Sequence, residues 1–188
     1  LSSPFPYVRH FDATTIQSST PFIKLKNQIE TFIQKDTDYE VVFRKLWLVD
    51  TTPKDSDQTK LPYIPHFDKE RYLKAMIYLT DVTHLDDGPI HLLNSEIDGL
   101  DTKRRSLPRN HKEKGLNHIQ LEDDAEITPI VGNAGTMILF DTNTPHKAGT
   151  VAEGHRRKVL RFDFEDPSWN HRSLFRKIKD RLTEAIQP

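Results

Sequence analysis

The residues of this chain that could perform chemistry are its histidines and carboxylates, because it contains no cysteine. Nine histidines and 28 aspartates and glutamates occur among 188 residues. The lack of thiols excludes disulfides, thiolate catalysis and cysteine-based zinc or iron–sulfur sites. A transition metal would therefore be held by imidazole and carboxylate groups.

The pattern His-x-Asp occurs three times, beginning at His10, His66 and His84, so the tripeptide alone is weak evidence of a metal site. The first copy lies in a lead-in rich in Pro, Ser and Thr, and the third lies in a turn between two predicted strands. Both are expected at the surface. His66 and Asp68 instead end the strand-like stretch 61–67. Because residues i and i+2 of a strand point to the same face, one ion could bind both side chains.

A third ligand must come from elsewhere in the chain, and His146 is the candidate. It follows the strand-like stretch 135–141, which leads into a turn. Two imidazoles and one carboxylate on one face of a metal leave three open positions, the facial triad of non-haem iron(II) oxygenases. The alternative from the residues alone is a set of separate, solvated histidines.

Two adjacent arginines, Arg156 and Arg157, begin the strand that returns after His146. A planar guanidinium pairs bidentately with a carboxylate, so one of them could bind the distal carboxylate of 2-oxoglutarate while its oxo-acid end chelates iron. If Arg157 faces inward, so does Val159, and the opposite row of this strand is mostly apolar and could be covered by a helix. The alternation therefore favours Arg157, while a solvated strand end remains the alternative for both arginines.

Four stretches of the chain resemble the phytanoyl-CoA dioxygenase-like branch of the iron(II)/2-oxoglutarate oxygenases. They are 65–68, 78–81 with 87–89, 135–141 with 146–149, and 157–160, and the resemblance extends over about 47–164. It implies that His66, Asp68 and His146 bind iron and that Arg157 binds 2-oxoglutarate. Prolyl-hydroxylase-like relatives have a Gly-x-Arg ending that here would select Arg156, so both arginines stay candidates.

The resemblance also implies a reaction: hydroxylation of a C–H bond of a small organic substrate with O2, releasing succinate and CO2. Asp68 argues for hydroxylation, because halogenating relatives have a small residue at that position. Where the family commonly has a Pro-Gly-Ser-His turn, this chain has Leu-Asn-Ser-Glu at 93–96, so this loop predicts no substrate. The alternatives are a cupin-like metal enzyme that does not use 2-oxoglutarate and a non-catalytic binding module.

The elements that must position these residues are mostly short strands without intervening helices. This pattern predicts a mainly β double-stranded β-helix (jelly-roll, cupin-like) with flanking α-helices. Helices are predicted at about 21–34 and after Pro167, and strands at 41–49, 63–68, 75–82, 89–93, 127–131, 136–140 and 159–164. The charged stretch 98–124 is predicted to be a long loop. Its basic residues at 103–114 could bind an anionic substrate, although a solvated loop is the simpler interpretation.

Composition sets the remaining expectations. A chain of 188 residues suits one domain, 1–188, and 35% hydrophobic with 29% charged residues suits a soluble globular protein. A net charge of -1 favours neither nucleic acid nor an anionic membrane as a partner, which leaves a small-molecule substrate. No apolar run is long enough to span a membrane. The chain shows no signal peptide and its start suggests trimming, so a cytoplasmic location is expected.

Overall fold

Strands form most of the regular structure in the part of the chain that the computed structural model describes, residues 8–11, 18–93, 100–108, 114–120 and 126–169. The elements in chain order are β1 (Val8–Phe11), α2 (Thr20–Asp36), β2 (Val42–Thr51), the 3-10 turn η1 (Pro53–Asp55), β3 (Leu73–Tyr78), β4 (Ile90–Leu93), α3 (Leu100–Ser106), β5 (Ile127–Ile130), β6 (Met137–Asp141), β7 (His146–Ala148) and β8 (Arg157–Glu165). The predicted mainly β class is confirmed.

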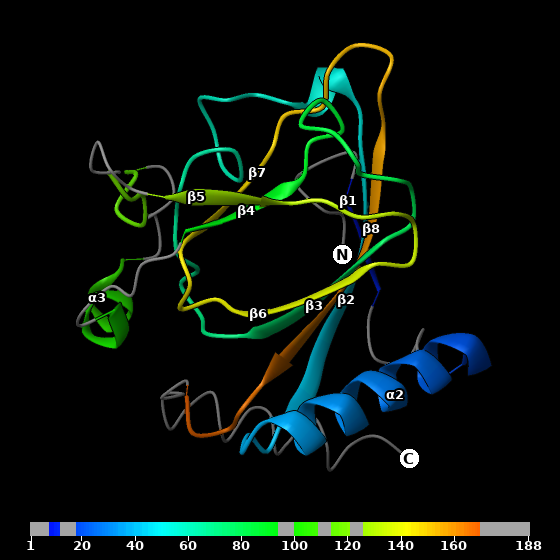
Figure 1. The fold of residues 1–188 in the computed structure, drawn as a ribbon. Helices are drawn as coiled ribbons and strands as arrows, with labels where there is room; N and C mark the ends of the chain where they lie inside the picture. Colours follow the sequence, from blue (N-terminus) through cyan, green and yellow to red (C-terminus); the bar gives the residue numbers. More distant parts are fainter. Residues whose placement is uncertain (1–7, 12–17, 94–99, 109–113, 121–125, 170–188) are drawn as a thin grey trace.

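The strands form two antiparallel sheets that lie opposite each other (Figure 1). The larger sheet has the order β1-β2-β8-β3-β6, and the smaller one has the order β5-β4-β7. Strands that are neighbours within a sheet are mostly distant in sequence, which is the crossover pattern of a jelly roll. This arrangement is the predicted double-stranded β-helix.

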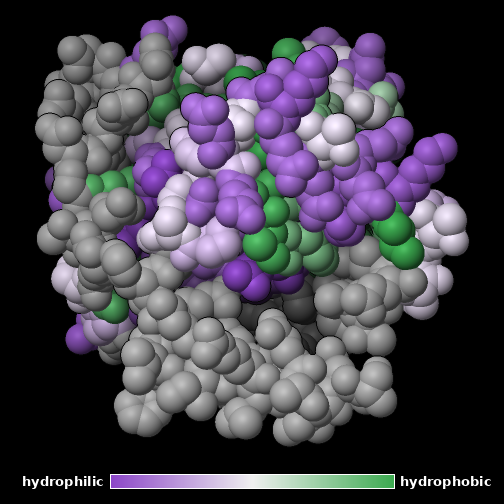
Figure 2. All heavy atoms as spheres, turned by 90° about the horizontal axis from the view of Figure 1, so that it is seen from below, coloured by the Kyte–Doolittle hydropathy of each residue, from purple (hydrophilic) through white to green (hydrophobic). Residues whose placement is uncertain are grey.

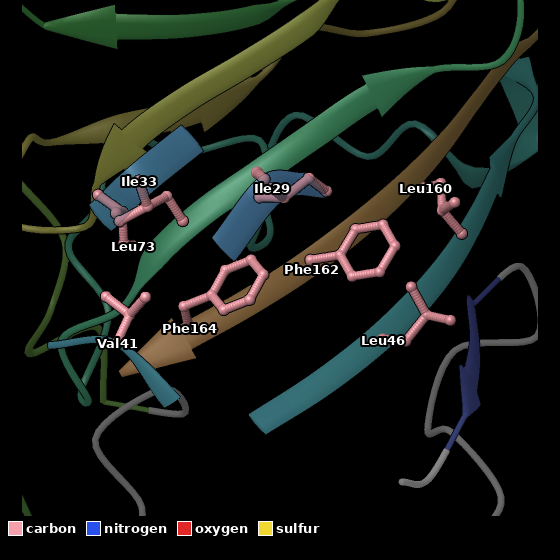
Figure 3. Packing of buried hydrophobic residues seen from close by; sticks show 9 residues of the cluster. Ile29, Ile33, Val41, Leu46, Leu73, Leu160, Phe162 and Phe164 are labelled. Carbon is pink, nitrogen blue, oxygen red and sulfur yellow. The ribbon is translucent and has the colours of Figure 1, made fainter. Parts of the chain in front are cut away.

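Helix α2 covers the outer face of the larger sheet and forms the main hydrophobic core with it (Figure 3). Pro21 sits in the first turn, where its missing N–H costs no hydrogen bond, and the predicted helix start is correct within a residue. Ile29 and Ile33, one turn apart, are 3% and 0% exposed, and burying each contributes about 1.5–3 kcal/mol. They pack against Val41, which immediately precedes β2, and against residues of the larger sheet: Leu46, Leu73, Ala75, Leu160, Phe162 and Phe164.

A second core lies on the other face of the larger sheet, between the two sheets. Val159 packs there with Tyr78, Val82, Ile90, Ile138 and Phe140. Along β8, Val159 therefore faces inward while Leu160, Phe162 and Phe164 face the helix. The alternation predicted for this strand, including the covering helix, is confirmed.

The predicted strand at 63–68 is wrong in extent, because only His66 forms β-bridges in this stretch, to His146 and His118. Pro62 precedes the stretch and Pro65 lies within it, and a proline has no N–H to donate to a ladder. The other predicted strands are confirmed with ends that shift by a few residues. Strands β1 and β7 were not predicted, since their sequences, Val-Arg-His-Phe and His-Lys-Ala, contain no apolar run.

The stretch 98–124 is not wholly a loop, since it contains α3. Leu100 and Arg104 lie four residues apart on this helix, so they share one face, and both are buried. The helix predicted after Pro167 falls mostly on residues outside the described part of the chain. Among the described residues, no helix is long and apolar enough to cross a membrane.

On the face of the molecule shown in Figure 2, hydrophilic side chains predominate among the coloured residues, and hydrophobic ones form small areas. Large hydrophobic residues that are exposed lie in different parts of the chain, such as Phe32 in α2 and Leu85 between β3 and β4. Isolated exposed apolar residues of this kind are normal on a protein surface.

Candidate metal centre

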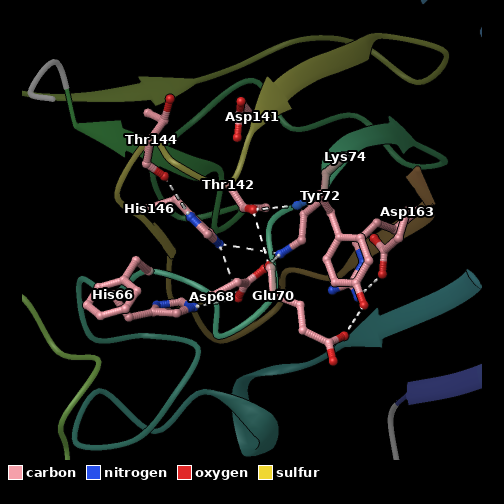
Figure 4. A network of polar contacts seen from close by, with 12 residues as sticks. His66, Asp68, Glu70, Tyr72, Lys74, Asp141, Thr142, Thr144, His146 and Asp163 are labelled. Atoms are coloured by element: carbon pink, nitrogen blue, oxygen red, sulfur yellow. Dashed lines mark hydrogen bonds and ion pairs between the residues drawn. The ribbon is translucent and has the colours of Figure 1, made fainter. Parts of the chain in front are cut away.

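The three predicted metal ligands converge at one end of the space between the sheets (Figure 4). The backbone N–H of His66 donates to the carbonyl of His146 at 3.1 Å, and the N–H of His146 donates back at 3.0 Å. This closed pair of hydrogen bonds places the two residues directly opposite each other, and Asp68 follows two positions later on the same side. The prediction that distant segments bring these three residues together is confirmed.

The distances allow a shared ion. Asp68 Oδ1 lies 3.8 Å from His66 Nε2 and 3.9 Å from His146 Nε2, and one donor atom of each residue lies within 4.8 Å of the others. Donors that each sit roughly 2.0–2.2 Å from one metal are up to about 4.4 Å apart. Two imidazoles and a carboxylate with these spacings fit a divalent metal of the iron, zinc or manganese type after small side-chain movements.

Hydrogen bonds fix which ring nitrogen faces the site. His66 Nδ1 lies 2.8 Å from the carbonyl of Ile64, and His146 Nδ1 lies 3.0 Å from the carbonyl of Thr144. A carbonyl only accepts, so Nδ1 carries the proton in each ring and Nε2 presents its lone pair toward Asp68. Burial lowers the pKa of His146 well below its ordinary value, and the nearby Lys74 ammonium adds to this shift, so the ring is neutral and can bind a metal.

Lys74 is part of the centre, although the sequence analysis did not identify it. Its Nζ lies 2.5 Å from Asp68 Oδ2 and 3.4 Å from His146 Nε2, and its side chain is 6% exposed. Burial would raise the pKa of Asp68, but the charge of Lys74 holds it well below its usual range, so the carboxylate is ionised. The available signal was a lysine at the inward position of an otherwise apolar strand, where Lys74, Met76 and Tyr78 alternate with the outer row.

Arg104 of α3 ties together the two backbone segments that carry the ligands. Its Nε donates to the carbonyl of Asp68 at 2.8 Å, and its Nη2 donates to the carbonyl of Thr142 at 2.7 Å. It also donates to the side-chain oxygen of Asn143. The interpretation of the basic stretch 103–114 as a solvated loop is therefore wrong at this residue, because Arg104 is 5% exposed while Lys103 is exposed.

A second support, from the longer stretch 98–124, is Asn117, which is 1% exposed. Its backbone carbonyl accepts from the N–H of Phe67 at 3.1 Å, and its side-chain amide donates to the carbonyl of Phe67 at 3.0 Å. Phe67, which lies between His66 and Asp68, is therefore held in place by Asn117. Of the two other copies of His-x-Asp, the third has an exposed His84, and the first includes Asp12, which lies outside the described residues.

The two candidate arginines point in opposite directions. Arg157 is 5% exposed on the inner face of the larger sheet and donates to the carbonyl of Gly88. Arg156 is 54% exposed at its side chain and pairs with Asp50, with an Nη2–Oδ2 distance of 2.5 Å. Arg157 is therefore the arginine between the sheets, where the alternation along β8 predicted it.

Thr51 stands directly opposite Arg157 in the β2–β8 register, so the two side chains share the inner face. The threonine is 1% exposed, and its hydroxyl has no hydrogen-bond partner among the described residues. A buried hydroxyl normally has a partner, so this one is suited to a bound group. A guanidinium beside an unsatisfied hydroxyl fits a carboxylate.

A double-stranded β-helix with two histidines and one aspartate between its sheets defines the class of non-haem metal oxygenases. The profile of the family described as phytanoyl-CoA dioxygenase (PhyH) matches residues 27–159. This chain therefore belongs to the phytanoyl-CoA dioxygenase family. The match confirms the family that the four sequence stretches predicted, and with it the class of iron- and 2-oxoglutarate-dependent enzymes.

Solved structures show the same fold at low sequence identity. AviO1 from Streptomyces viridochromogenes Tue57 is 17% identical with a TM-score of 0.57, over 92% of this chain and 78% of that one. HygX from Streptomyces hygroscopicus, solved with nickel and 2-oxoglutarate bound, is 15% identical with a TM-score of 0.53, over 89% and 73%. SnoN, a non-heme alpha ketoglutarate dependent epimerase from nogalamycin biosynthesis, is 16% identical with a TM-score of 0.55, over 85% and 62%. Among curated proteins, none matches the chain.

Proposed function

We propose that this protein hydroxylates a C–H bond of a small organic molecule, with iron(II) held by His66, Asp68 and His146. The observation that carries the proposal is the convergence of Asp68 Oδ1 with the Nε2 atoms of both histidines, 3.8 and 3.9 Å away. Both imidazoles present a lone pair and the carboxylate is ionised, which is the donor set that ferrous iron takes in such enzymes. When bound, iron, 2-oxoglutarate and O2 supply the oxidant, and the products are the alcohol, succinate and CO2.

We assign the distal carboxylate of 2-oxoglutarate to Arg157, with Thr51 as a second donor. A buried guanidinium binds a carboxylate through two parallel hydrogen bonds, and the unsatisfied Thr51 hydroxyl supplies another. This pair also favours a 2-oxoglutarate enzyme over a cupin-like enzyme that needs no dicarboxylate, because a buried guanidinium beside an unsatisfied hydroxyl suits a carboxylate. HygX has been solved with 2-oxoglutarate on the same fold.

The protein's own part in the reaction is binding, orientation and exclusion of water. The carbonyls of Ile64 and Thr144 orient the two imidazoles, and Arg104 and Asn117 hold the backbone around Asp68. The apolar residues between the sheets keep bulk water from the co-substrate. No side chain is assigned a role as general acid or base.

Hydroxylation is one of several outcomes known for this fold, since SnoN is an epimerase. Asp68 favours hydroxylation over halogenation, because the carboxylate occupies the position that a halide would need. The substrate is proposed to be a small molecule, and HygX, on the same fold, has been solved with hygromycin B bound. The single domain over 1–188 and the cytoplasmic location remain predictions.

The test is formation of succinate from 2-oxoglutarate by the purified protein with added iron(II) and oxygen. Small amino acids, acyl thioesters, phosphonates and aminoglycosides would be screened for stimulated turnover and for products heavier by one oxygen. His146→Ala should abolish succinate formation, while His84→Ala, which changes an exposed histidine of the same pattern, should leave it unchanged. An iron-loaded protein that forms no succinate with any of these compounds would refute the proposal.

A further inference from the structure

Lys74 is a buried cation at a position where a strand residue normally packs in the core. It lies on the inner face of β3, between Phe140 of β6 and Asp163 of β8 in the sheet register. Its ammonium lies 5.9 Å from the centre of the Phe140 ring, and the residue is 5% exposed. Burying a charge is costly unless the charge is paired, so the residue that pairs with Lys74 indicates its role.

The partner of Lys74 is the carboxylate that faces the two histidines, and the two oxygens of that carboxylate have different surroundings (Figure 4). Asp68 Oδ1 is the atom nearest to the imidazoles, at 3.8 and 3.9 Å. Asp68 Oδ2 lies 2.5 Å from Lys74 Nζ. The ammonium therefore holds Oδ2 and leaves Oδ1 for a metal, while its longer 3.4 Å contact with His146 Nε2 would be replaced when a metal binds that nitrogen.

We propose that Lys74 is a positioning residue that keeps Asp68 a one-oxygen metal ligand. The inference rests on the proposed function, since it concerns the iron site of that enzyme. A carboxylate with both oxygens free can chelate a metal and fill two positions, whereas one that is held at Oδ2 fills a single position. Two imidazoles and one oxygen then leave three positions, which 2-oxoglutarate and O2 require.

The charge of Lys74 should also affect how tightly the metal and 2-oxoglutarate bind. Asp68 and Lys74 together are neutral, and the neighbouring pair of Arg161 and Asp163 is neutral as well, so these residues do not offset the two positive charges of a divalent metal. A dianionic co-substrate supplies this compensation. Lys74 should therefore weaken the binding of the metal alone and strengthen the binding of 2-oxoglutarate to the metal-loaded protein.

The experiment measures the two affinities separately by calorimetry under anaerobic conditions. Mn(II) is titrated into the metal-free protein, and 2-oxoglutarate is then titrated into the Mn(II)-loaded protein. Lys74→Met should bind Mn(II) at least about threefold more tightly and 2-oxoglutarate about tenfold more weakly, the size expected for one charge-assisted contact. Lys158→Met removes a lysine charge on the outer face of the same sheet and should change neither affinity.

The opposite signs of the two changes distinguish positioning from a structural role. If Lys74 only supported the fold, Lys74→Met would weaken both affinities, and this result would overturn the inference. Unchanged affinities would overturn it as well. If Lys74→Met does not fold by circular dichroism, Lys74→Gln decides, with the same two signs expected relative to the unmodified protein. A failure of the unmodified protein to bind Mn(II) or 2-oxoglutarate would instead refute the proposed function.

Discussion

The backbones of His66 and His146 are hydrogen-bonded to each other in both directions, with N–O distances of 3.1 and 3.0 Å. Their ring centres lie 4.6 Å apart as a consequence of this single bridge. The spacing of the two imidazoles is therefore set by main-chain geometry before any metal binds. The carboxylate of Asp68, in contrast, is oriented by a side chain, that of Lys74.

The ion pair between Asp68 and Lys74 predicts a non-additive effect on stability. Asp68→Ala leaves the Lys74 ammonium buried without its carboxylate and should cost about 2–3 kcal/mol, below the range for fully buried pairs because the Asp68 side chain is 25% exposed. The double variant Asp68→Ala/Lys74→Met removes both charges and should recover most of this loss. Urea unfolding in the presence of a chelator measures both. Equal stability of the single and double variants would contradict the pairing.

Replacing Arg104 should cause a large loss of stability, although its side chain contacts none of the side-chain atoms proposed to bind the metal. Arg104→Met leaves the carbonyls of Asp68 and Thr142 without their donor, which should lower the free energy of unfolding by about 2–4 kcal/mol. Lys103→Met, on the exposed side of the same helix, should change it by less than about 0.5 kcal/mol. Thermal or urea unfolding of the two variants compares them directly, and similar effects would show that Arg104 does not hold these segments together.

The sequence was sufficient for the parts of the site that depend on local geometry. His66 and Asp68 were identified from two-residue alternation, although only His66 forms bridges there, and the inward direction of Arg157 follows from the apolar row of β8. The roles of Lys74 and Arg104 could not be predicted in this way. The burial of Arg104 depends on Asp68, 36 residues away, and local patterns do not encode such pairs. For Lys74 the alternation of β3 gives the inward direction, but it does not identify Asp68 as the partner.

The loop before β4 predicts a dependence of stability on pH. Burial would raise the pKa of Asp87, but hydrogen bonds from the His155 ring and from the N–H groups of His84 and Thr83 lower it below 3.8. Because the folded-state pKa is depressed, the stabilisation is present above the unfolded value and is lost as the pH falls through the folded value. Asp87→Asn should therefore cost about 1 kcal/mol at neutral pH, and the difference should shrink below about pH 4. Urea midpoints of both proteins from pH 7 to pH 3 test this, and a constant difference would contradict it.

The neighbouring arginines of β8 predict a sharp contrast in co-substrate binding. Arg157→Met removes the buried guanidinium and should weaken 2-oxoglutarate binding at least about 100-fold, since a bidentate charged contact contributes about 3 kcal/mol or more. Thr51→Val keeps the shape of the side chain and removes only the hydroxyl, so the loss should be about three- to tenfold. Arg156→Met breaks an exposed pair with Asp50 and should leave binding within about twofold of the unmodified protein.

Titration of 2-oxoglutarate into the Mn(II)-loaded variants measures all three affinities without turnover. The loss of affinity should be largest for Arg157→Met, smaller for Thr51→Val and smallest for Arg156→Met, because Arg157 and Thr51 share the inner face while Arg156 lies outside. A large loss in Arg156→Met with little change in Arg157→Met would reverse the assignment. An unchanged affinity in Thr51→Val would show that the buried hydroxyl serves the fold and does not bind the carboxylate, and Arg157 would then act alone.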